Sequence, residues 1–333
     1  FLVVLVLMPF DLPVINDLPL VRFLGDNSWL RPVNRMLIFA IAAVGLNLLS
    51  GVAGQVSLGH AFFMGVGAST AVLVGGADTS RLWGWGLPMW IWLPAAGLVA
   101  AAVGVLVAPA AVRVRGLYLG IATIGLVFIG IHLSRVFPEI AGPPQLGRKW
   151  PRLELRFWKE ETPLVDFSRK GHWLWFDIGN NQKTYLLLLG ILVVLSLVAA
   201  NLARSRTGRS WAAIRDRDVA AEIMGVHEFR AKTTAFAISS FYAGVAGALF
   251  ASLSGYMYPE AWNLLLSVEM IAILLIGGMG RISGALMGSF FVALSPRFLE
   301  ESVRWAAEQA EGDGVFAGIW DSLISLGPSD FGF

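Results

Sequence analysis

Three polar side chains occupy an unusual place in this sequence, inside a glycine-rich stretch between two apolar segments. The polar residues and the glycines around them are Gln55, Ser57 and His60, with Gly51, Gly54 and Gly59. Irregular backbone at membrane depth is tolerated only where it is buried in protein or lines a cavity. These side chains are therefore candidates to line the path of a small solute. The alternative is that the glycines allow tight packing and that Ser57 caps a helix.

A charged segment, 204–232, is the second place where the residues suggest a function. Ser210 is a fair N-cap and Gly225 a fair stop, which predicts a short helix over 211–224. Its residues Trp211, Arg215, Asp218 and Glu222 are spaced by four, three and four, so they are expected to share one face. Such a helix between two apolar segments suggests a docking element for a soluble partner. The alternative is an ordinary solvated loop.

A second glycine-rich break, Gly277-Gly278-Met279-Gly280-Arg281, also lies between two apolar pieces. The glycines are expected to interrupt the helix there, with Arg281 anchoring the break at the cytoplasmic face. The pattern Gly277-x-x-Gly280 resembles Gly51-x-x-Gly54, and transporters are often built from repeated halves with interrupted helices near the substrate path. Glu269, near the start of the preceding apolar run, is expected to cap a helix at headgroup level. The alternative is a buried carboxylate that contacts a cationic or amino group.

Other kinds of chemistry are excluded by what the sequence lacks. It has no cysteine, so disulfides and thiolate chemistry are absent, and none of its four histidines lies within five positions of another, so a helical His-x-x-x-His metal pair is absent. No lysine follows a glycine, so the chain has no phosphate loop for ATP hydrolysis. A net charge of +2 is too small to indicate nucleic-acid binding. We therefore expect neither an enzyme nor a chain that binds a metal or cofactor.

The elements that position these residues follow from the spacing of charges. Hydrophobic residues make up 56% of the 333 residues and charged residues only 14%. Long runs hold no charged residue, and they cover 36–77, 82–112, 116–134, 184–203 and 233–259. One helical crossing of a bilayer needs about 20 apolar residues. The sequence therefore predicts an all-α, polytopic transmembrane helical bundle of about 8–10 spans with glycine-broken helices.

The organisation predicted along the chain is one integral-membrane domain over 1–333. Apolar helices are expected at 33–50, 61–77, 88–111, 116–137, 185–203, 233–253, 267–280 and 282–296. Positive charge flanking the spans places 204–232 in the cytoplasm and the polar connection 138–183 outside. Residues 297–333 are expected to be a tail, followed by a last span that this sequence does not contain. Residues 1–9 are interpreted as the end of a clipped helix.

Several blocks in this order resemble the LivM-type permeases of branched-chain amino acid ABC importers. They read GVAGQVSLGHAFFMGVGA (51–68), RGLYLGIATIGL (115–126), GRSWAAIRDRDVAAEIMGV (208–226), KTTAFAISSFYAGVAGALFA (232–251) and GGMGRISGALMGSFF (277–291). The LivH-type permeases are similar as well, but the Arg-Gly-Leu-Tyr block and the GRSWAAIRDRD block favour LivM. The sequence departs from the family pattern in the long loop 138–183 and at both ends.

The resemblance implies a permease subunit in the bacterial cytoplasmic (inner) membrane. It implies a second, similar permease, two ABC ATPase subunits that carry ATP and Mg, and an extracytoplasmic substrate-binding protein. The residues it assigns to the ATPase-coupling surface are Arg209, Trp211, Arg215, Asp218, Ala220, Ala221, Glu222 and Gly225. Permeases for urea or short-chain amides are close relatives, so these substrates are an alternative. A different class of protein, a self-sufficient secondary transporter or channel, is a further alternative. The charge-free runs, however, offer only histidines as ionisable groups for ion coupling.

Overall fold

A computed structural model describes residues 27–76, 83–114, 116–142, 148–150, 153–155, 165–166, 171–173, 176–178 and 180–310. Six helices in these ranges are long and apolar enough to cross a membrane by length and composition. Two shorter apolar helices, His60–Gly75 and Leu264–Gly277, accompany them. The structure thus confirms the predicted all-α polytopic bundle.

The helices follow one another with few strands between them. The first half holds α3 (Asn27–Leu46), a π-helix η1 (Asn47–Val52), α4 (His60–Gly75), α5 (Met89–Arg113), α6 (Leu117–Val136) and α7 (Pro138–Ala141). The second half holds α8 (Asn180–Arg204), α9 (Arg206–Ile223), α10 (Glu228–Ser254), the 3-10 helix η2 (Pro259–Trp262), α11 (Leu264–Gly277) and α12 (Ile282–Ala310).

The connection between α7 and α8 contains short antiparallel strand pairs. Strand β2 (Glu154–Leu155) pairs with β3 (Val165–Asp166), and β4 (Gly171–Trp173) pairs with β5 (Phe176–Ile178). Strand β1 (Arg148–Lys149) pairs instead with β6 (Tyr256–Met257), which directly follows α10. The β1–β6 pair therefore ties this connection to the end of a long apolar helix.

Helix α10 is the centre of the bundle and packs mainly against α5, α4 and α3. Small residues allow this close approach, because a Cβ atom added at Gly247 would lie 2.0 Å from the carbonyl oxygen of Met64 on α4. One added at Gly67 would lie 2.2 Å from the carbonyl oxygen of Gly244. The small residues of α10 thus let neighbouring helices approach its backbone closely.

Several helices extend beyond the predicted apolar segments. Helix α3 begins at Asn27 rather than at residue 33, α10 begins at Glu228 rather than at residue 233, and α12 continues past residue 296 to Ala310. The predicted tail at 297–333 therefore begins inside a helix, and its part after residue 310 lies outside the described residues, as does 1–9. Charge-free runs measure the apolar part of a helix, and charged residues readily occupy helical turns beyond it.

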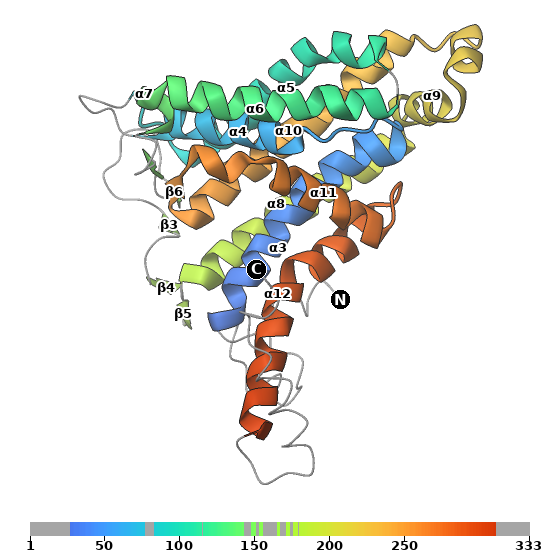
Figure 1. Cartoon of the computed structure of the whole chain (residues 1–333). Helices are drawn as coiled ribbons and strands as arrows, with labels where there is room; N and C mark the ends of the chain where they lie inside the picture. The colour runs from blue at the N-terminus through green and yellow to red at the C-terminus, as the bar shows by residue number, and fades with distance from the viewer. Residues whose placement is uncertain are drawn as a thin grey trace.

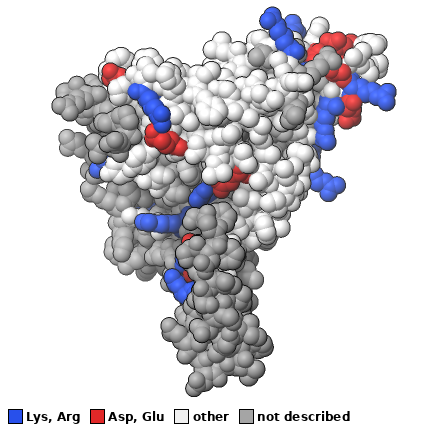
Figure 2. Space-filling view, viewed as in Figure 1, with Lys and Arg blue, Asp and Glu red and all other residues white. Residues whose placement is uncertain are grey.

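The two polar regions lie at opposite ends of the bundle. Figure 1 shows the strands and α7 at one end and α9 at the other. In Figure 2 the charged side chains gather mainly at the corner formed by α9, while a broad field of uncharged surface covers the helices between the ends. This distribution suits a chain whose middle lies in lipid and whose two ends meet water.

Candidate coupling and translocation site

The glycine-rich stretch after α3 folds as an irregular link. The last turn of α3 widens into the π-helix η1, and 53–59 is non-helical, with Gly54 in the left-handed region at φ +69°. The side chains then alternate, since Gln55 and Ser57 are buried whereas Val56 is 40% exposed. One edge of the link therefore faces the protein while the other faces outward.

Three helices hold this link inside the bundle. The backbone N–H of Leu58 donates to Thr123 Oγ1 on α6 at 2.9 Å, and that of Ala61 donates to Ser267 Oγ on α11 at 3.0 Å. The ring Nε2 of His60 lies 3.0 Å from the carbonyl oxygen of Ala42, one turn before the end of α3. The chain thus turns back from the end of α3 into the bundle, where protein groups satisfy its backbone.

The predicted pathway residues are distributed over both edges of the link. Gly51, Ser57, Gly59 and His60 are buried, and Gly54 is exposed. Gln55 is only 5% exposed, and neither polar atom of its amide has a hydrogen-bond partner among the described residues. A buried amide without partners is costly, so Gln55 is the residue of this set whose position suggests a function beyond packing.

The second glycine-rich break lies between α11 and α12. The structure places Gly277 at the end of α11, Gly278 and Gly280 in positive-φ conformations at +95° and +89°, and Arg281 just before α12. The backbone N–H of Gly280 donates to Asn47 Oδ1 at 2.7 Å. A Cβ atom added at Gly51 would lie 2.5 Å from the Gly280 nitrogen. The two breaks, far apart in sequence, are therefore in direct contact.

Helix α9 begins earlier than predicted and is not straight. Its N-cap is Ser205, whose Oγ accepts from the backbone N–H of Gly208, so the prediction of Ser210 as the N-cap is wrong. Arg217 adopts φ −155° and ψ 102° and interrupts the helix. The expected common face of Trp211, Arg215, Asp218 and Glu222 is therefore also wrong, because the extended residue reorients everything that follows it.

Trp211 anchors α9 to the bundle. Its side chain is 1% exposed, and the indole Nε1 donates to the carbonyl oxygen of Ala231 at 2.9 Å and to Thr234 Oγ1 at 3.2 Å. Both acceptors lie in the first turns of α10. A movement of α9 would therefore be transmitted to the central helix.

Arg215 joins α9 to the first glycine break. Its Nη1 donates to the carbonyl oxygen of Gly51, and a Cβ atom added at Gly54 would lie 2.7 Å from Arg215 Cγ. The side chain of Arg215 is thus directed toward η1 and the link rather than only toward solvent. One residue of the predicted coupling surface meets one element of the predicted pathway.

The other predicted coupling residues lie near the outer surface of α9. Arg209, Ala220, Glu222 and Gly225 are exposed, Asp218 is half-buried and Ala221 is buried. An exposed apolar group, which the sequence reasoning missed, accompanies them, and it consists of Val219, Ile223 and Met224. The sequence did contain a signal for this group, because residues 219 and 223 are apolar and one helical turn apart in a charged segment. Together these side chains form a mixed polar and apolar surface at the end of the molecule.

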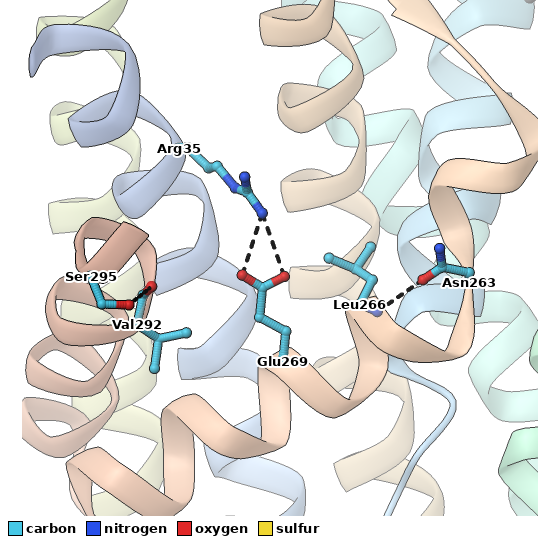
Figure 3. A network of polar contacts seen from close by, with 6 residues as sticks. All are labelled: Arg35, Asn263, Leu266, Glu269, Val292 and Ser295. Carbon is cyan, nitrogen blue, oxygen red and sulfur yellow. Dashed lines mark hydrogen bonds and ion pairs between the residues drawn. The ribbon is translucent and has the colours of Figure 1, made fainter. Parts of the chain in front are cut away.

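Glu269 does not cap a helix, contrary to expectation. The N-cap of α11 is Asn263, whose Oδ1 accepts from the backbone N–H of Leu266 at 3.0 Å. Glu269 lies further along α11 and pairs with Arg35 of α3, whose Nη2 is 3.3 Å from Oε1 and 3.5 Å from Oε2 (Figure 3). The prediction failed because the partner is 234 positions away on another helix, a contact that periodicity within one segment does not reveal.

Comparison with known proteins decides the family. The model of the family described as "Branched-chain amino acid transport system / permease component" matches residues 30–319. The chain belongs to this family. Relatives include the high-affinity branched-chain amino acid transport system permease protein LivM of Escherichia coli (33% identical) and that of Salmonella typhimurium (32%). Each alignment covers 85% of this chain and 66% of the relative, so the chain spans just under two thirds of their length.

A more distant likeness covers only part of the chain. The autoinducer 2 import system permease protein LsrC of Enterobacter sp. is 34% identical over 110 residues, which is 31% of this chain and 32% of that protein. No solved structure matches. Family membership confirms the LivM-like resemblance to a permease component, and the six helices of membrane-spanning length support an integral protein of the bacterial inner membrane.

Proposed function

We propose that this chain is a permease subunit of an ABC importer that moves branched-chain amino acids into the cell. The observation that carries the proposal is the family match over 30–319, which includes the link, α9 and both glycine breaks. The names of the LivM relatives support the substrate class. No comparison favours urea or short-chain amides.

The proposed assembly contains a second, similar permease, two ABC ATPase subunits and an external substrate-binding protein. This chain itself would bind no cofactor, and ATP with Mg²⁺ would be held by the ATPases. The surface of α9 made by Glu222, Val219, Ile223 and Met224 suits docking to an ATPase, because it combines a charge with exposed apolar side chains at the α9 end of the bundle.

The contacts of α9 suggest how docking of an ATPase would move the membrane-spanning helices. A displacement of α9 would move Trp211 against α10 and Arg215 against Gly51. Because Gly51 contacts Gly280, the same displacement would reach the break between α11 and α12. We propose that this chain of contacts couples ATP hydrolysis to the opening of a pathway near Gln55, Ser57 and His60.

Uptake by the reconstituted importer tests the proposal. The permease would be co-expressed with the proposed second permease, ATPases and binding protein, and placed in proteoliposomes. We expect ATP-dependent uptake of leucine, isoleucine and valine, and none of urea or acetamide. Uptake of urea without uptake of leucine would overturn the substrate assignment. Transport by this chain in the absence of any ATPase would overturn the ABC importer assignment.

A further inference from the structure

The ion pair between Arg35 and Glu269 lies within the helical part of the bundle. Glu269 precedes Gly277 by eight residues, about 12 Å along α11 at 1.5 Å per residue. The run 36–77 after Arg35 and the run 270–280 after Glu269 hold no other charged residue. The two charges therefore meet in an otherwise apolar setting, where ionisable side chains usually mark the route of a solute.

The pair is accessible, although its surroundings are apolar. The Arg35 side chain is 46% exposed and that of Glu269 is 25% exposed. Charged side chains at membrane depth rarely face lipid, and they face a protein partner or a water-filled path instead. The accessible side of this pair is therefore assigned to the interior of the importer.

The pair is a loose contact that leaves donors of Arg35 unused. The distances of 3.3 and 3.5 Å exceed the roughly 2.7–2.9 Å of a tight charge-assisted hydrogen bond. Among the described residues, Arg35 hydrogen-bonds through Nη2 alone, and its guanidinium lies 4.8 Å from the centroid of the Phe39 ring. The other N–H donors of the Arg35 guanidinium thus stay available, and the Phe39 ring holds the guanidinium in place by a cation–π contact.

Apolar side chains lie beside the carboxylate. Leu265 and Val268, on the turn of α11 that precedes Glu269, are 73% and 46% exposed. Figure 3 shows Arg35 and Glu269 directed toward each other across the space between α3 and α11. The exposed surface thus places one cation and one anion side by side, next to an apolar patch.

We propose that Arg35 and Glu269 bind the backbone of the transported amino acid, Arg35 holding the α-carboxylate and Glu269 the α-ammonium group. The opposite charges of a zwitterion lie on one carbon, so they can meet the two side chains together, and an aliphatic side chain would rest on Leu265 and Val268. The assignment rests on the proposed function and adds the residues that recognise the substrate.

Binding of radiolabelled leucine to the complete importer tests this subsite. The importer is held in nanodiscs without nucleotide or binding protein, and leucine, 4-methylpentanoate (no ammonium group) and leucinol (no carboxylate) compete for the label. In the wild type, leucine competes best. In Glu269→Gln, the affinity of leucine relative to 4-methylpentanoate falls about tenfold. In Arg35→Gln, the affinity of leucine relative to leucinol falls by the same factor, which is the scale of one charge-assisted contact.

A second ion pair provides the matched control. Arg135 and Glu260 lie 3.2 Å apart and are 55% and 49% exposed, so Glu260→Gln removes a comparable charge elsewhere. This variant keeps the wild-type selectivity. If Glu269→Gln cannot be purified, Arg35→Lys, which keeps the charge, retains discrimination against leucinol whereas Arg35→Gln does not.

The outcomes separate this subsite from the proposed function. The subsite is overturned if Glu269→Gln and Arg35→Gln keep the wild-type selectivity, or if Glu260→Gln loses selectivity to the same extent. It is also overturned if the wild type binds no leucine at millimolar leucine. If the wild type nevertheless takes up leucine with ATP, the proposed function stands. Absence of ATP-driven uptake of every branched-chain amino acid overturns the proposed function itself.

Discussion

Asn47 and Gly280 join the two glycine breaks, with the backbone N–H of Gly280 donating to Asn47 Oδ1 at 2.7 Å. The Asn47 side chain is buried completely. Its carbonyl serves a backbone group that no helix satisfies, because Gly280 lies between α11 and α12. The hydrogen bond thus fixes the position of one break relative to the other.

Replacing Asn47 with Ala should destabilise this junction. The substitution removes the acceptor of the Gly280 N–H, and because Gly280 itself is exposed, the loss is that of one ordinary hydrogen bond, about 0.5–1.5 kcal/mol. We expect a lower melting temperature of the purified importer and a weaker stimulation of its ATPase by loaded binding protein.

Asn34→Ala is the matched control for this change. Asn34 is equally buried, and its Nδ2 donates to the carbonyl oxygen of Asn181 at 3.2 Å, away from both breaks. It should lower the melting temperature but leave the ATPase stimulation intact. Equal loss of stimulation in the two variants would show that general instability, not the junction, explains the effect.

Gly51→Ala should be poorly tolerated. The added Cβ atom would lie 2.2 Å from Asn47 Oδ1 and 2.5 Å from the Gly280 nitrogen, and neither a buried side chain nor a backbone atom can easily give way. Overpacking of this kind costs about 1–3 kcal/mol. We expect a reduced yield of folded protein, measured by fluorescence-detected size exclusion.

Gly190→Ala serves as the comparison, since nothing lies within 4 Å of the Cβ atom it would add to α8. Alanine is the better helix former by about 1 kcal/mol, so the yield should stay the same or rise. A Gly51→Ala variant as stable as Gly190→Ala would contradict the close contact between the two breaks.

The bundle was predictable from the sequence because charge spacing reports directly on the bilayer, and the long apolar runs correspond to the helices that the structure describes. The exact ends of α3, α10 and α12 could not be predicted in this way, because helical turns continue into charged residues such as Glu228. The shape of α9 was missed because a single extended residue, Arg217, breaks a pattern that looks continuous in sequence.

The candidate site was predictable in its parts but not in its connections. Glycines at 51, 54, 277 and 280 identified both breaks, yet periodicity within one helix says nothing about contacts between helices far apart in the chain. The pairing of Asn47 with Gly280 and of Arg35 with Glu269 depends on how the helices pack. For the same reason Arg215, expected at the docking surface, turned out to contact Gly51 as well.

Trp211→Phe should loosen the attachment of α9 to α10. Phenylalanine keeps most of the buried apolar surface but loses the indole N–H that donates to Ala231 and Thr234. We expect a modest loss of stability, about 1 kcal/mol, whereas Trp211→Ala should cost about 3–5 kcal/mol by leaving a cavity. Thermal unfolding in detergent measures both, and a Phe variant as unstable as the Ala variant would contradict this division.

Arg215→Ala should uncouple ATP hydrolysis from transport. Without the guanidinium, α9 keeps its anchor at Trp211 but loses its contact with the Gly51 carbonyl, so a movement of α9 would no longer reach the first break. We expect leucine uptake in proteoliposomes to fall about tenfold or more, the equivalent of at least one charged hydrogen bond, while the ATPases stay bound. Arg206→Ala is the control on the same helix, because Arg206 is exposed in the first turn of α9 and is not one of the coupling residues. It should transport at nearly the wild-type rate. Full uptake by Arg215→Ala, or loss of the ATPases from the purified complex, would show that Arg215 does not transmit the movement of α9.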